Sequence, residues 1–267
     1  ENPAARKAIA EQLSLLWNLG IKLVVVHGGG GSIDEVCMRL GLPTEKVAGR
    51  RVTSPEVLKV VKMVLAGDVH IDLTAQLRGA GLQVVGITGV DSGVVRATRR
   101  PPVRVREDGA AESREVDYGL VGELVPTEPT LVHHLLAGGF VPLVAPIVGG
   151  DKGEVYNTNA DTVAAALAGT LHAEKLIFML TVPGLMRDPK APSSLIPYAT
   201  TNEIDGLISE GVVTGGMRPK LAAAMSALEA GVPSVHLVSG LSPDALLGEI
   251  FTNEGSGTML RQGEGTN

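Results

Sequence analysis

The sequence predicts an α/β protein in which a mainly parallel sheet is covered by helices. Apolar β-branched runs alternate along the chain with segments whose apolar residues recur every three or four positions, the pattern of strands and amphipathic helices. Hydrophobic residues make up 44% of the chain and aromatic residues only 3%, so the core must be built from aliphatic side chains. Such a composition is typical of parallel sheets covered by helices. With 267 residues, the chain can bury a large core in one domain or two lobes.

In the first half, a helix is expected over 4–19, ending at Gly20. A buried strand over 23–27 follows, then four glycines at 28–31 and a helix start that reaches residue 40. Ser54, Pro55 and Glu56 are typical of a helix N-terminus, and apolar spacing extends that helix to residue 79. Further expected elements are strands over 84–88 and 140–146, a helix over 131–137, and an antiparallel hairpin excursion over 94–125 that forms a lid or flap, with a turn at Asp108–Gly109.

The second half repeats the alternation. The expected elements are helices over 161–169, 203–209 and 217–230, strands over 175–180 and 232–238, a loop over 181–192, a helix begun by Ser242 and Pro243, and an edge strand over 257–260. The alternation of helices and strands is least regular at the segment GGDKGE, residues 149–154, which is typical of a boundary between lobes. The sequence therefore predicts a boundary there, between an N-terminal lobe of residues 1–152 and a C-terminal lobe of residues 153–267.

Charge and cysteine content exclude several classes of protein. The net charge of −6 argues against nucleic-acid binding, because a phosphate-backbone binder normally carries a basic patch. The single cysteine, Cys37, excludes an internal disulfide; it lies on an apolar helix face and is predicted to be a buried, inert thiol. No apolar run approaches the roughly 18 residues needed to span a membrane. We expect a cytoplasmic protein that binds neither nucleic acid nor membrane.

The strongest local signal is the segment KLVVVHGGGGSIDEVCMRL, at 22–40. A strand, a turn without side chains and a helix start allow the oxyanions of a ligand to approach backbone N–H groups, and the helix N-terminus adds partial positive charge. The segment therefore predicts an anion cradle. The alternative is that the glycines only permit a tight turn between strand and helix.

Two later segments also carry polar groups at helix starts. In YNTNAD, at 156–161, two amides and a carboxylate precede an alanine-rich helix, so Asn159 or Asp161 could bind a ligand or could simply cap the helix. In TGGMRPK, at 214–220, two glycines open a helix and Lys220 lies one turn in, where its ammonium can reach back toward the N-terminus. The alternative for Lys220 is an ordinary surface lysine.

Together and in this order, the segments resemble the amino acid kinase family, most closely its members that phosphorylate N-acetyl-L-glutamate. The resemblance covers nearly the whole chain and is carried by VVVHGGGGSIDE, AGRRVT (48–53), DYGLVGE (117–123), NTNAD, LTVPGL, TGGMRPK and EIFTNEGSGTM (249–259). It implies a three-layer αβα sandwich of the carbamate kinase-like type. Its N-terminal lobe would bind the amino-acid substrate and form a dimer, and its C-terminal lobe would bind ATP.

The resemblance also implies transfer of the ATP γ-phosphoryl group to the side-chain carboxylate of N-acetylglutamate, giving an acyl phosphate in arginine biosynthesis. The N–H groups of Gly29 and Gly30 would face the transferring group. Arg51 would bind the α-carboxylate of the substrate and Asn157 the acetamido acid. Lys220 would neutralise charge on the ATP side, and Asp161 would orient the catalytic lysines.

Nucleotide contacts implied by the same resemblance are Thr181, Val182, Pro183, Gly184, Leu185 and Met186, together with Val212, Val213 and Thr214. Thr181 stands where the family usually has Asp, which removes a carboxylate near the nucleotide. Mg²⁺ would be held mainly by the phosphates, so no protein metal ligand is implied, and the six histidines show no ligand spacing.

The resemblance has two further implications. His236, Glu249 and Gly255 match members that arginine inhibits, and those members tend to form hexamers. For this chain the resemblance implies a homo-oligomer, either a dimer or a hexamer. The alternative is that Glu249 only ends a helix and Gly255 only makes a turn. Family members also begin with a strand that carries a lysine; this sequence begins after that point, and we expect it to be incomplete there.

Two other functions are open. A related kinase acts on α-aminoadipate or its carrier conjugate in lysine biosynthesis, but the intact AGRRVT and NTNAD segments favour acetylglutamate. A non-catalytic protein could keep the fold and sense arginine or acetylglutamate without turnover; the presence of Lys220 and Asp161 counts against it.

Overall fold

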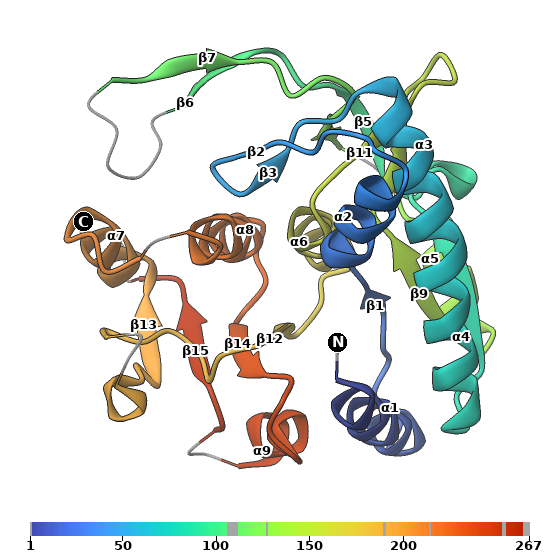
Figure 1. Cartoon of the computed structure of the whole chain (residues 1–267). Coiled ribbons are helices and arrows are strands. Elements are labelled where there is room, and N and C mark those ends of the chain that lie inside the picture. Colours follow the sequence, from blue (N-terminus) through green and yellow to red (C-terminus); the bar gives the residue numbers. More distant parts are fainter. Residues whose placement is uncertain are drawn as a thin grey trace. The chain divides into compact units, whose positions relative to one another are not determined.

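The computed structural model describes residues 2–105, 112–126, 128–188, 191–213, 215–252 and 255–263. The chain forms two compact units (Figure 1). One unit is Lys22–Leu167, and the other combines Glu1–Ile21 with Ala168–Asn267. The units divide the chain at places other than the expected boundary between 152 and 153, so the assignment of a function to each lobe stays a prediction.

The core of unit Lys22–Leu167 is a parallel sheet in the order β1 (Val25–Val26), β9 (Val141–Ala145) and β4 (Val84–Thr88). Every residue of β9 is buried, as expected for a central strand with helices on its faces. The helices of this unit are α2 (Gly30–Arg39), α3 (Pro55–Met63), α4 (Val69–Gly79) and α5 (Thr130–Ala137), with a 3-10 turn, η2, at Asp91–Gly93. Helix α4 contacts β4 and β9, and α5 contacts β9.

A second sheet of the same unit has the order β11 (Val155–Asn157), β10 (Ile147–Gly149), β5 (Arg96–Arg99) and β8 (Gly122–Val125). Two short hairpins accompany it: β2 (Lys46–Val47) with β3 (Arg50–Arg51), and β6 (Val103–Val105) with β7 (Arg114–Val116). The segment at 150–154 is the turn between β10 and β11, closed by a hydrogen bond from Gly150 N to Glu154 O of 2.9 Å.

The predicted antiparallel excursion over 94–125 is confirmed, but its expected separation from the core is only partly right. Strands β5 and β8 pair with each other and β5 also pairs with β10, so they belong to the second sheet. Only β6 and β7 stand apart as a hairpin (Figure 1). The expected turn at Asp108–Gly109 lies outside the described residues.

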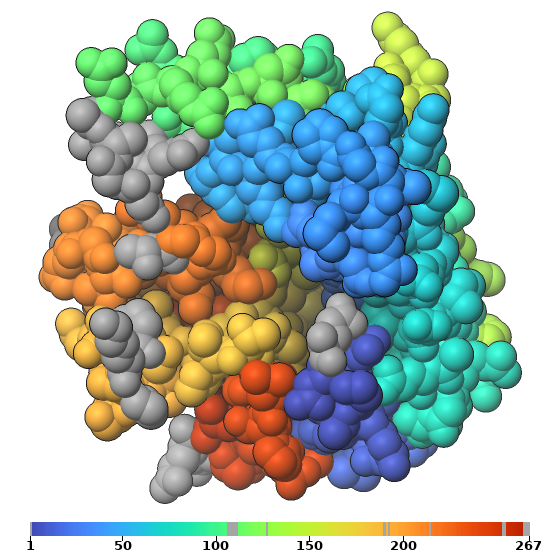
Figure 2. All heavy atoms as spheres, in the orientation of Figure 1, coloured from blue at the N-terminus to red at the C-terminus, as the bar shows by residue number. Residues whose placement is uncertain are grey.

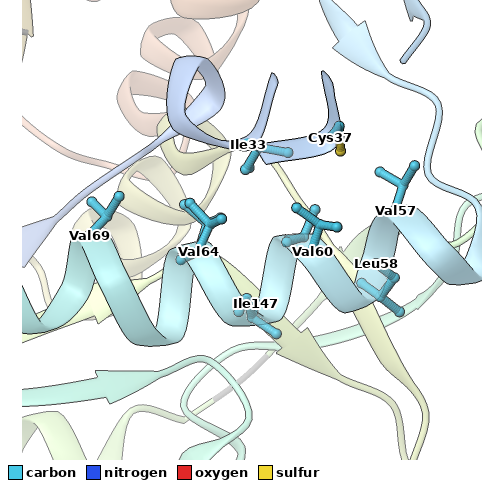
Figure 3. Close-up of a cluster of buried hydrophobic side chains, with 10 residues drawn as sticks. Ile33, Cys37, Val57, Leu58, Val60, Val64, Val69 and Ile147 are labelled. Atoms are coloured by element: carbon cyan, nitrogen blue, oxygen red, sulfur yellow. The ribbon is translucent and has the colours of Figure 1, made fainter. Parts of the chain in front are cut away.

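The long helix predicted from residue 55 is present, and Ser54 caps it by accepting a hydrogen bond from Val57 N at 3.2 Å. Between α3 and α4 it contains a π-helical turn, η1 (Val64–Asp68), which the apolar spacing does not reveal. Helix α2 packs across this region (Figure 3). Its inward side chains, Ile33 and Cys37, join a buried apolar cluster. The members labelled in Figure 3 are Ile33, Cys37, Val57, Leu58, Val60, Val64, Val69 and Ile147.

The predicted burial of Cys37 is confirmed. Its side chain has no exposed surface, and burial is the main reason that the pKa of the thiol is raised above its usual range. A thiol that stays protonated and out of solvent is unreactive. Cys37 therefore acts as a small apolar side chain of the α2 core.

The other unit is built on a sheet in the order β12 (Leu176–Leu180), β14 (Val235–Ser239), β15 (Thr258–Arg261) and β13 (Tyr198–Thr200). Its helices are α1 (Pro3–Asn18), α7 (Thr201–Ser209), α8 (Met217–Glu229) and α9 (Ala245–Phe251), with a 3-10 turn, η3, at Pro192–Ser194. Helices α8 and α9 both contact β14 and lie on opposite sides of it (Figure 1). Helix α6 (Ala160–Thr170) spans the point where the two units divide.

Helix α1 belongs with the end of the chain. Gln12, which is buried, accepts hydrogen bonds through Oε1 from Leu246 N at 3.1 Å and Leu247 N at 3.2 Å. One amide oxygen thus binds two of the N–H groups that the start of α9 leaves without partners in the helix.

One strand prediction in this unit is wrong. The segment 257–260 was expected at a sheet edge, but β15 pairs with β14 on one side and with β13 on the other. The sequence gives no strand pattern for β13, since it is short and its only fully buried residue is Ala199. Helix α7 begins at Thr201, two residues earlier than expected, because Thr200 and Glu203 form a capping box.

The fold class is confirmed: the structure is mixed α/β, and parallel pairing dominates the sheets that carry the helices. Among the described residues, no helix is both long enough and apolar enough to cross a membrane.

Truncation of Ile33 tests the packing of α2. Ile33→Ala removes a side chain that is 3% exposed from the cluster in Figure 3, and we expect the free energy of unfolding to fall by about 3 kcal/mol. Met38→Ala, on the same helix at a side chain that is 73% exposed, should change it by less than about 0.5 kcal/mol. Urea unfolding of both variants measures the difference; equal effects would mean that α2 does not pack as described.

Candidate active site

The glycine-rich turn joins a core strand to a helix. Strand β1 ends at Val26 and α2 begins at Gly30, with Gly29 as an N-cap that has no side chain to bind the helix amides. A Cβ added at Gly30 would meet nothing within 4 Å, whereas one added at Gly29 would lie 2.6 Å from Leu65 Cδ2. The turn is therefore packed against η1 on one side and open at Gly30.

The open side of the turn is suited to an anion. The first amides of a helix have no carbonyl one turn earlier to bind, and the helix dipole adds partial positive charge. Gly28, Gly30 and Gly31 are exposed, and Figure 2 shows that the mid-blue segment containing α2 reaches the surface. The predicted strand, turn and helix are present, and binding of an anion by the turn stays a prediction.

Arg51 is 8% exposed and binds the glycine turn directly. Its Nη2 donates to Gly30 O at 3.0 Å, and its Nη1 lies 2.6 Å from Asp34 Oδ1. Lys46 Nζ lies 2.6 Å from Asp34 Oδ2. Burial opposes ionisation of Asp34, but the hydrogen bonds and charges of Arg51 and Lys46 outweigh it and lower the pKa of the carboxyl group. Arg51 thus holds the turn, and its predicted contact with a substrate carboxylate is not tested.

Asn157 lies at the end of β11 and is buried. Its Nδ2 donates to Thr53 Oγ1 at 3.1 Å. The backbone of Thr53 is held in turn by the segment DYGLVGE, since Thr53 N donates to Tyr118 O at 2.9 Å and Leu120 N donates to Thr53 O at 2.8 Å. Gly119 has φ +72°, and a Cβ there would lie 2.5 Å from Thr53 O, so this close approach requires glycine. Three segments that carry the family resemblance therefore meet at Thr53.

For Asn159, the structure supports the role of a helix cap. Its Oδ1 accepts hydrogen bonds from Asp161 N at 2.6 Å and Thr162 N at 3.4 Å, at the start of α6. Asp161 lies in the first turn of α6 and is half-buried. Its predicted role in orienting catalytic lysines stays a prediction.

Sequence reasoning missed a pair of buried histidines beside the turn. His27 directly precedes the glycines and is 7% exposed, and His70, on α4, is 6% exposed. His27 Nε2 and His70 Nδ1 lie 2.8 Å apart, and His27 Nδ1 donates to Gly28 O at 3.1 Å. Burial is the main reason that the pKa of each histidine is lowered. Two features of the sequence could have indicated that these histidines are buried. His27 directly precedes the glycines, and His70 is next to the core residue Val69.

The predicted nucleotide segment is in the other unit and follows β12. Leu185 N donates to Thr258 Oγ1 at 2.9 Å, and a Cβ at Gly184 would lie 2.6 Å from that oxygen, so the segment is tied closely to β15. Thr181 and Pro183 are exposed, Val182 and Met186 are half-buried, and Leu185 is buried; in the second predicted segment, Val212 is half-buried and Val213 is buried. Thr214 lies outside the described residues.

Lys220 is in the first turn of α8 and half-buried. Its Nζ lies 5.9 Å from the centroid of the Phe178 ring, within range of a cation–π interaction. Since Phe178 is in β12, the ammonium is placed over the strand that leads into the predicted nucleotide segment.

His236, Glu249 and Gly255, predicted as an arginine effector site, are brought together in the structure. His236 Nδ1 lies 2.6 Å from Glu249 Oε1. Gly255 has φ +67°, and a Cβ there would lie 2.9 Å from Glu249 Oε2. Arginine binding at this cluster is not tested.

The carboxylate of Glu249 is bound from several sides. Its Oε2 accepts hydrogen bonds from Ser256 N at 2.6 Å and Gly257 N at 3.0 Å, while His236 binds the other oxygen. Burial opposes ionisation, but these hydrogen bonds together lower the pKa of Glu249 to about 2. Glu249 therefore joins α9, β14 and the turn before β15, so it stabilises the packing of these three elements.

Comparison with known proteins identifies the family of this chain. The model of the amino acid kinase family matches residues 1–239. The chain belongs to the amino acid kinase family. Acetylglutamate kinase of Myxococcus xanthus is 54% identical over 259 residues, which cover 97% of this chain and 84% of the relative.

Solved structures of other proteins share the fold of this family member. N-acetylglutamate synthase from Neisseria gonorrhoeae, complexed with coenzyme A and N-acetyl-glutamate, has a TM-score of 0.82 at 25% identity, over 99% of this chain and 57% of that one. Carbamate kinase from Giardia lamblia bound to AMP-PNP has a TM-score of 0.68 at 17% identity, over 98% of this chain and 92% of that one, which shows the fold alone.

Substitution of Gly30 tests whether the open side of the turn is needed for activity, without disturbing the fold. Gly30→Ala meets nothing within 4 Å, so the melting temperature should stay within a few degrees of the wild type, but the methyl group enters the open side of the turn. We expect kcat to fall by at least tenfold. Gly79→Ala, on α4 and also without neighbours within 4 Å, is the matched control and should keep full activity. A Gly30→Ala enzyme as active as this control would remove the turn from the active site.

The hydrogen bonds to the Glu249 carboxylate predict how the stability of the protein depends on pH. Because its pKa falls from 4.5 to about 2 on folding, the carboxylate contributes about 3 kcal/mol above pH 4.5, and this is lost as pH falls toward 2. Glu249→Gln should thus be less stable than the wild type at pH 7, and the difference should narrow between pH 5 and 3. Urea unfolding across this range tests it, with exposed Glu174→Gln as control; a constant difference for Glu249→Gln would contradict the lowered pKa.

Proposed function

We propose that this chain transfers the γ-phosphoryl group of ATP to the side-chain carboxylate of N-acetyl-L-glutamate, in arginine biosynthesis. The observation that carries the proposal is the 54% identity to an acetylglutamate kinase over 97% of this chain. The products are ADP and an acyl phosphate: a new bond joins the carboxylate oxygen to phosphorus as the bond to the β-phosphate oxygen breaks.

The chemistry requires positioning more than proton transfer. The acceptor carboxylate is ionised at neutral pH, so no general base is needed. The enzyme must bring two anions into line and stabilise the charge on the moving group. The open amides at Gly29 and Gly30 are suited to that charge, and Arg51 and Asn157 are the proposed contacts of the amino-acid substrate.

The proposed nucleotide site uses the other unit. Residues 181–186 and 212–214 would bind ATP, Lys220 would neutralise phosphate charge, and Asp161 would orient the catalytic lysines. Among the described residues, no three His, Cys, Asp or Glu side chains come together as a metal site. On the family resemblance, Mg²⁺ would be held mainly by ATP phosphate oxygens and water, as it commonly is in kinases.

Three further properties belong to this proposal. We place the enzyme in the cytoplasm, because its single cysteine is free and buried. We expect a homo-oligomer, dimer or hexamer, on the family resemblance. The cluster of His236, Glu249 and Gly255 would bind arginine as an inhibitor.

The test is an assay with hydroxylamine, which traps acyl phosphates as hydroxamates. ATP is supplied with N-acetylglutamate, α-aminoadipate derivatives or aspartate in parallel reactions. Hydroxamate formed only with N-acetylglutamate supports the proposal. Hydroxamate formed only with an α-aminoadipate derivative would move the function to lysine biosynthesis, and none with any acid, despite ATP binding, would favour a sensor.

The role of Lys220 predicts a specific kinetic pattern. Lys220→Ala should lower kcat by about 100-fold, the size of effect seen when a charge-stabilising group is lost, and should change the KM for N-acetylglutamate far less. Lys175→Ala, at an exposed lysine of the same unit, should leave both constants unchanged. If Lys220→Ala raised KM and spared kcat, Lys220 would be a substrate-binding residue instead.

A further inference from the structure

Thr53 lies between the two proposed contacts of the amino-acid substrate. Its Oγ1 is 3.3 Å from Arg51 O and 3.1 Å from Asn157 Nδ2. Thr53 has no exposed surface, and only 8% of Arg51 and 9% of Asn157 is exposed. Because water has little access to these groups, the hydrogen bonds of the Thr53 hydroxyl determine how its neighbours are oriented.

The carbonyl of Arg51 takes the proton of this hydroxyl. Arg51 faces Lys46 in the β2–β3 hairpin, and the next pair along is joined by a hydrogen bond from Val52 N to Glu45 O at 2.9 Å. Since bonded and unbonded pairs alternate in an antiparallel hairpin, the carbonyl of Arg51 points away from the strand of Lys46. A carbonyl oxygen only accepts, so the Thr53 hydroxyl donates to it.

The side-chain amide of Asn157 then has one orientation that fits. A hydroxyl has a single hydrogen, which Thr53 uses on Arg51 O, so towards Asn157 its oxygen can only accept. The atom of Asn157 that lies 3.1 Å from Thr53 Oγ1 must therefore be the NH2 nitrogen. Because the amide is planar, with its oxygen and nitrogen on different sides of the same carbon, Oδ1 of Asn157 points away from Thr53.

The backbone on both sides of this contact is held by one segment. Thr53 N donates to Tyr118 O at 2.9 Å, Leu120 N donates to Thr53 O at 2.8 Å, and Asn157 N donates to Leu120 O at 3.0 Å. Threonine is β-branched, which restricts the rotation of its side chain. The hydroxyl of Thr53 and the amide of Asn157 therefore meet in a fixed geometry.

The carbonyl oxygen of the Asn157 side chain is left for a ligand. Within the described part of the chain, Asn157 Oδ1 accepts no hydrogen bond, and it is not fully enclosed. A polar atom that is buried without a partner costs free energy, so an open acceptor on a side chain that is nine-tenths buried is suited to a donor from outside the protein. The ligand must supply an N–H or O–H at this point.

We propose that Thr53 is a positioning residue for substrate recognition: by turning the amide of Asn157, it presents an acceptor that selects acids with an N–H on the α-carbon substituent. The inference rests on the proposed function, since it takes Asn157 as a contact of the substrate. Thr53 itself touches neither substrate nor reacting atoms.

The acetamido group of N-acetylglutamate supplies such a donor. Its N–H is attached to the α-carbon, next to the α-carboxylate that Arg51 would bind. An ester oxygen in place of the N–H can only accept, so it would meet Asn157 Oδ1 acceptor to acceptor. A site that is built to bond an N–H rejects an analogue that lacks it, because the polar group of the site stays unpaired.

The first experiment compares two acids that differ at this position. 2-Acetoxyglutarate has an ester oxygen where N-acetylglutamate has its N–H, and ADP formation with each acid gives the ratio of the two kcat/KM values. We expect the wild type to favour the amide by about 100-fold. Thr53→Val keeps the shape of the side chain but removes the hydroxyl. It should raise the KM for N-acetylglutamate at least tenfold, change kcat less than threefold, and reduce the preference to below about fivefold, because the freed amide can turn its NH2 toward the ester oxygen.

Two further variants separate orientation from packing. Thr53→Ser keeps the hydroxyl and should keep the preference within threefold of the wild type. Val121→Ala, at a position that is 4% exposed and bridges to Asn157, loosens the packing. It should also keep the preference, since loosened packing affects both acids alike.

The second experiment needs no substrate. Proton exchange of the side-chain NH2 of Asn157 is followed by NMR in the unliganded full chain, with Asn157→Asp used to assign the signals. We expect one of the two protons to be protected in the wild type and in Thr53→Ser, and exposed to exchange in Thr53→Val. Rapid exchange of both protons in the wild type would mean that the NH2 faces the open side, which overturns the proposal.

The kinetic result can overturn it as well. A wild type that favours the amide less than fivefold, or a Thr53→Val enzyme that keeps the wild-type preference, contradicts the role of Thr53. If Thr53→Val does not fold, the wild-type preference, Thr53→Ser and the exchange of the wild type decide. A wild type that forms no ADP with N-acetylglutamate contradicts the proposed function, and the exchange experiment then still tests the orientation of Asn157.

Discussion

The glycine turn depends on hydrogen bonds to its carbonyl oxygens. Glycine has no side chain to restrict its backbone, so a run of glycines has no preferred orientation of its peptide groups. The ring of His27, the start of α2 and the guanidinium of Arg51 supply that orientation from three directions. The amides of the predicted cradle are therefore held in fixed directions, because the surrounding core constrains the carbonyl side of the same peptides.

That constraint explains several features around the turn. Arg51 is kept in place by Asp34, which Lys46 also binds, so a buried guanidinium has compensating charge. Thr53, two residues further on, receives Asn157 and the backbone of the DYGLVGE segment. Parts of the chain that are over 100 residues apart are thus joined in one hydrogen-bonded network, and the predicted substrate contacts share the support of the predicted phosphoryl cradle.

Much of the local structure could be read from the sequence. The helix begun by Ser54 and Pro55, the burial of Cys37 and the strand before the glycines follow from short-range patterns. Strand β13, the place of β15 inside its sheet and the π-helical turn were missed, because each depends on which distant segment packs alongside. The resemblance named Arg51 and Asn157, but not their partners Asp34 and Thr53.

The sequence by itself determined the α/β class and the family, since these follow from hydrophobic spacing, caps and motif order, and it named the candidate site residues, which stay a prediction. Only the tertiary structure decided that His70, 43 residues after His27, lies against it, that Gly86 leaves space for its ring, and that His236, Glu249 and Gly255 form one cluster. The physical reason is that spacing along a chain fixes which face of an element is apolar, whereas hydrogen bonds between buried polar groups depend on the register in which distant elements pack.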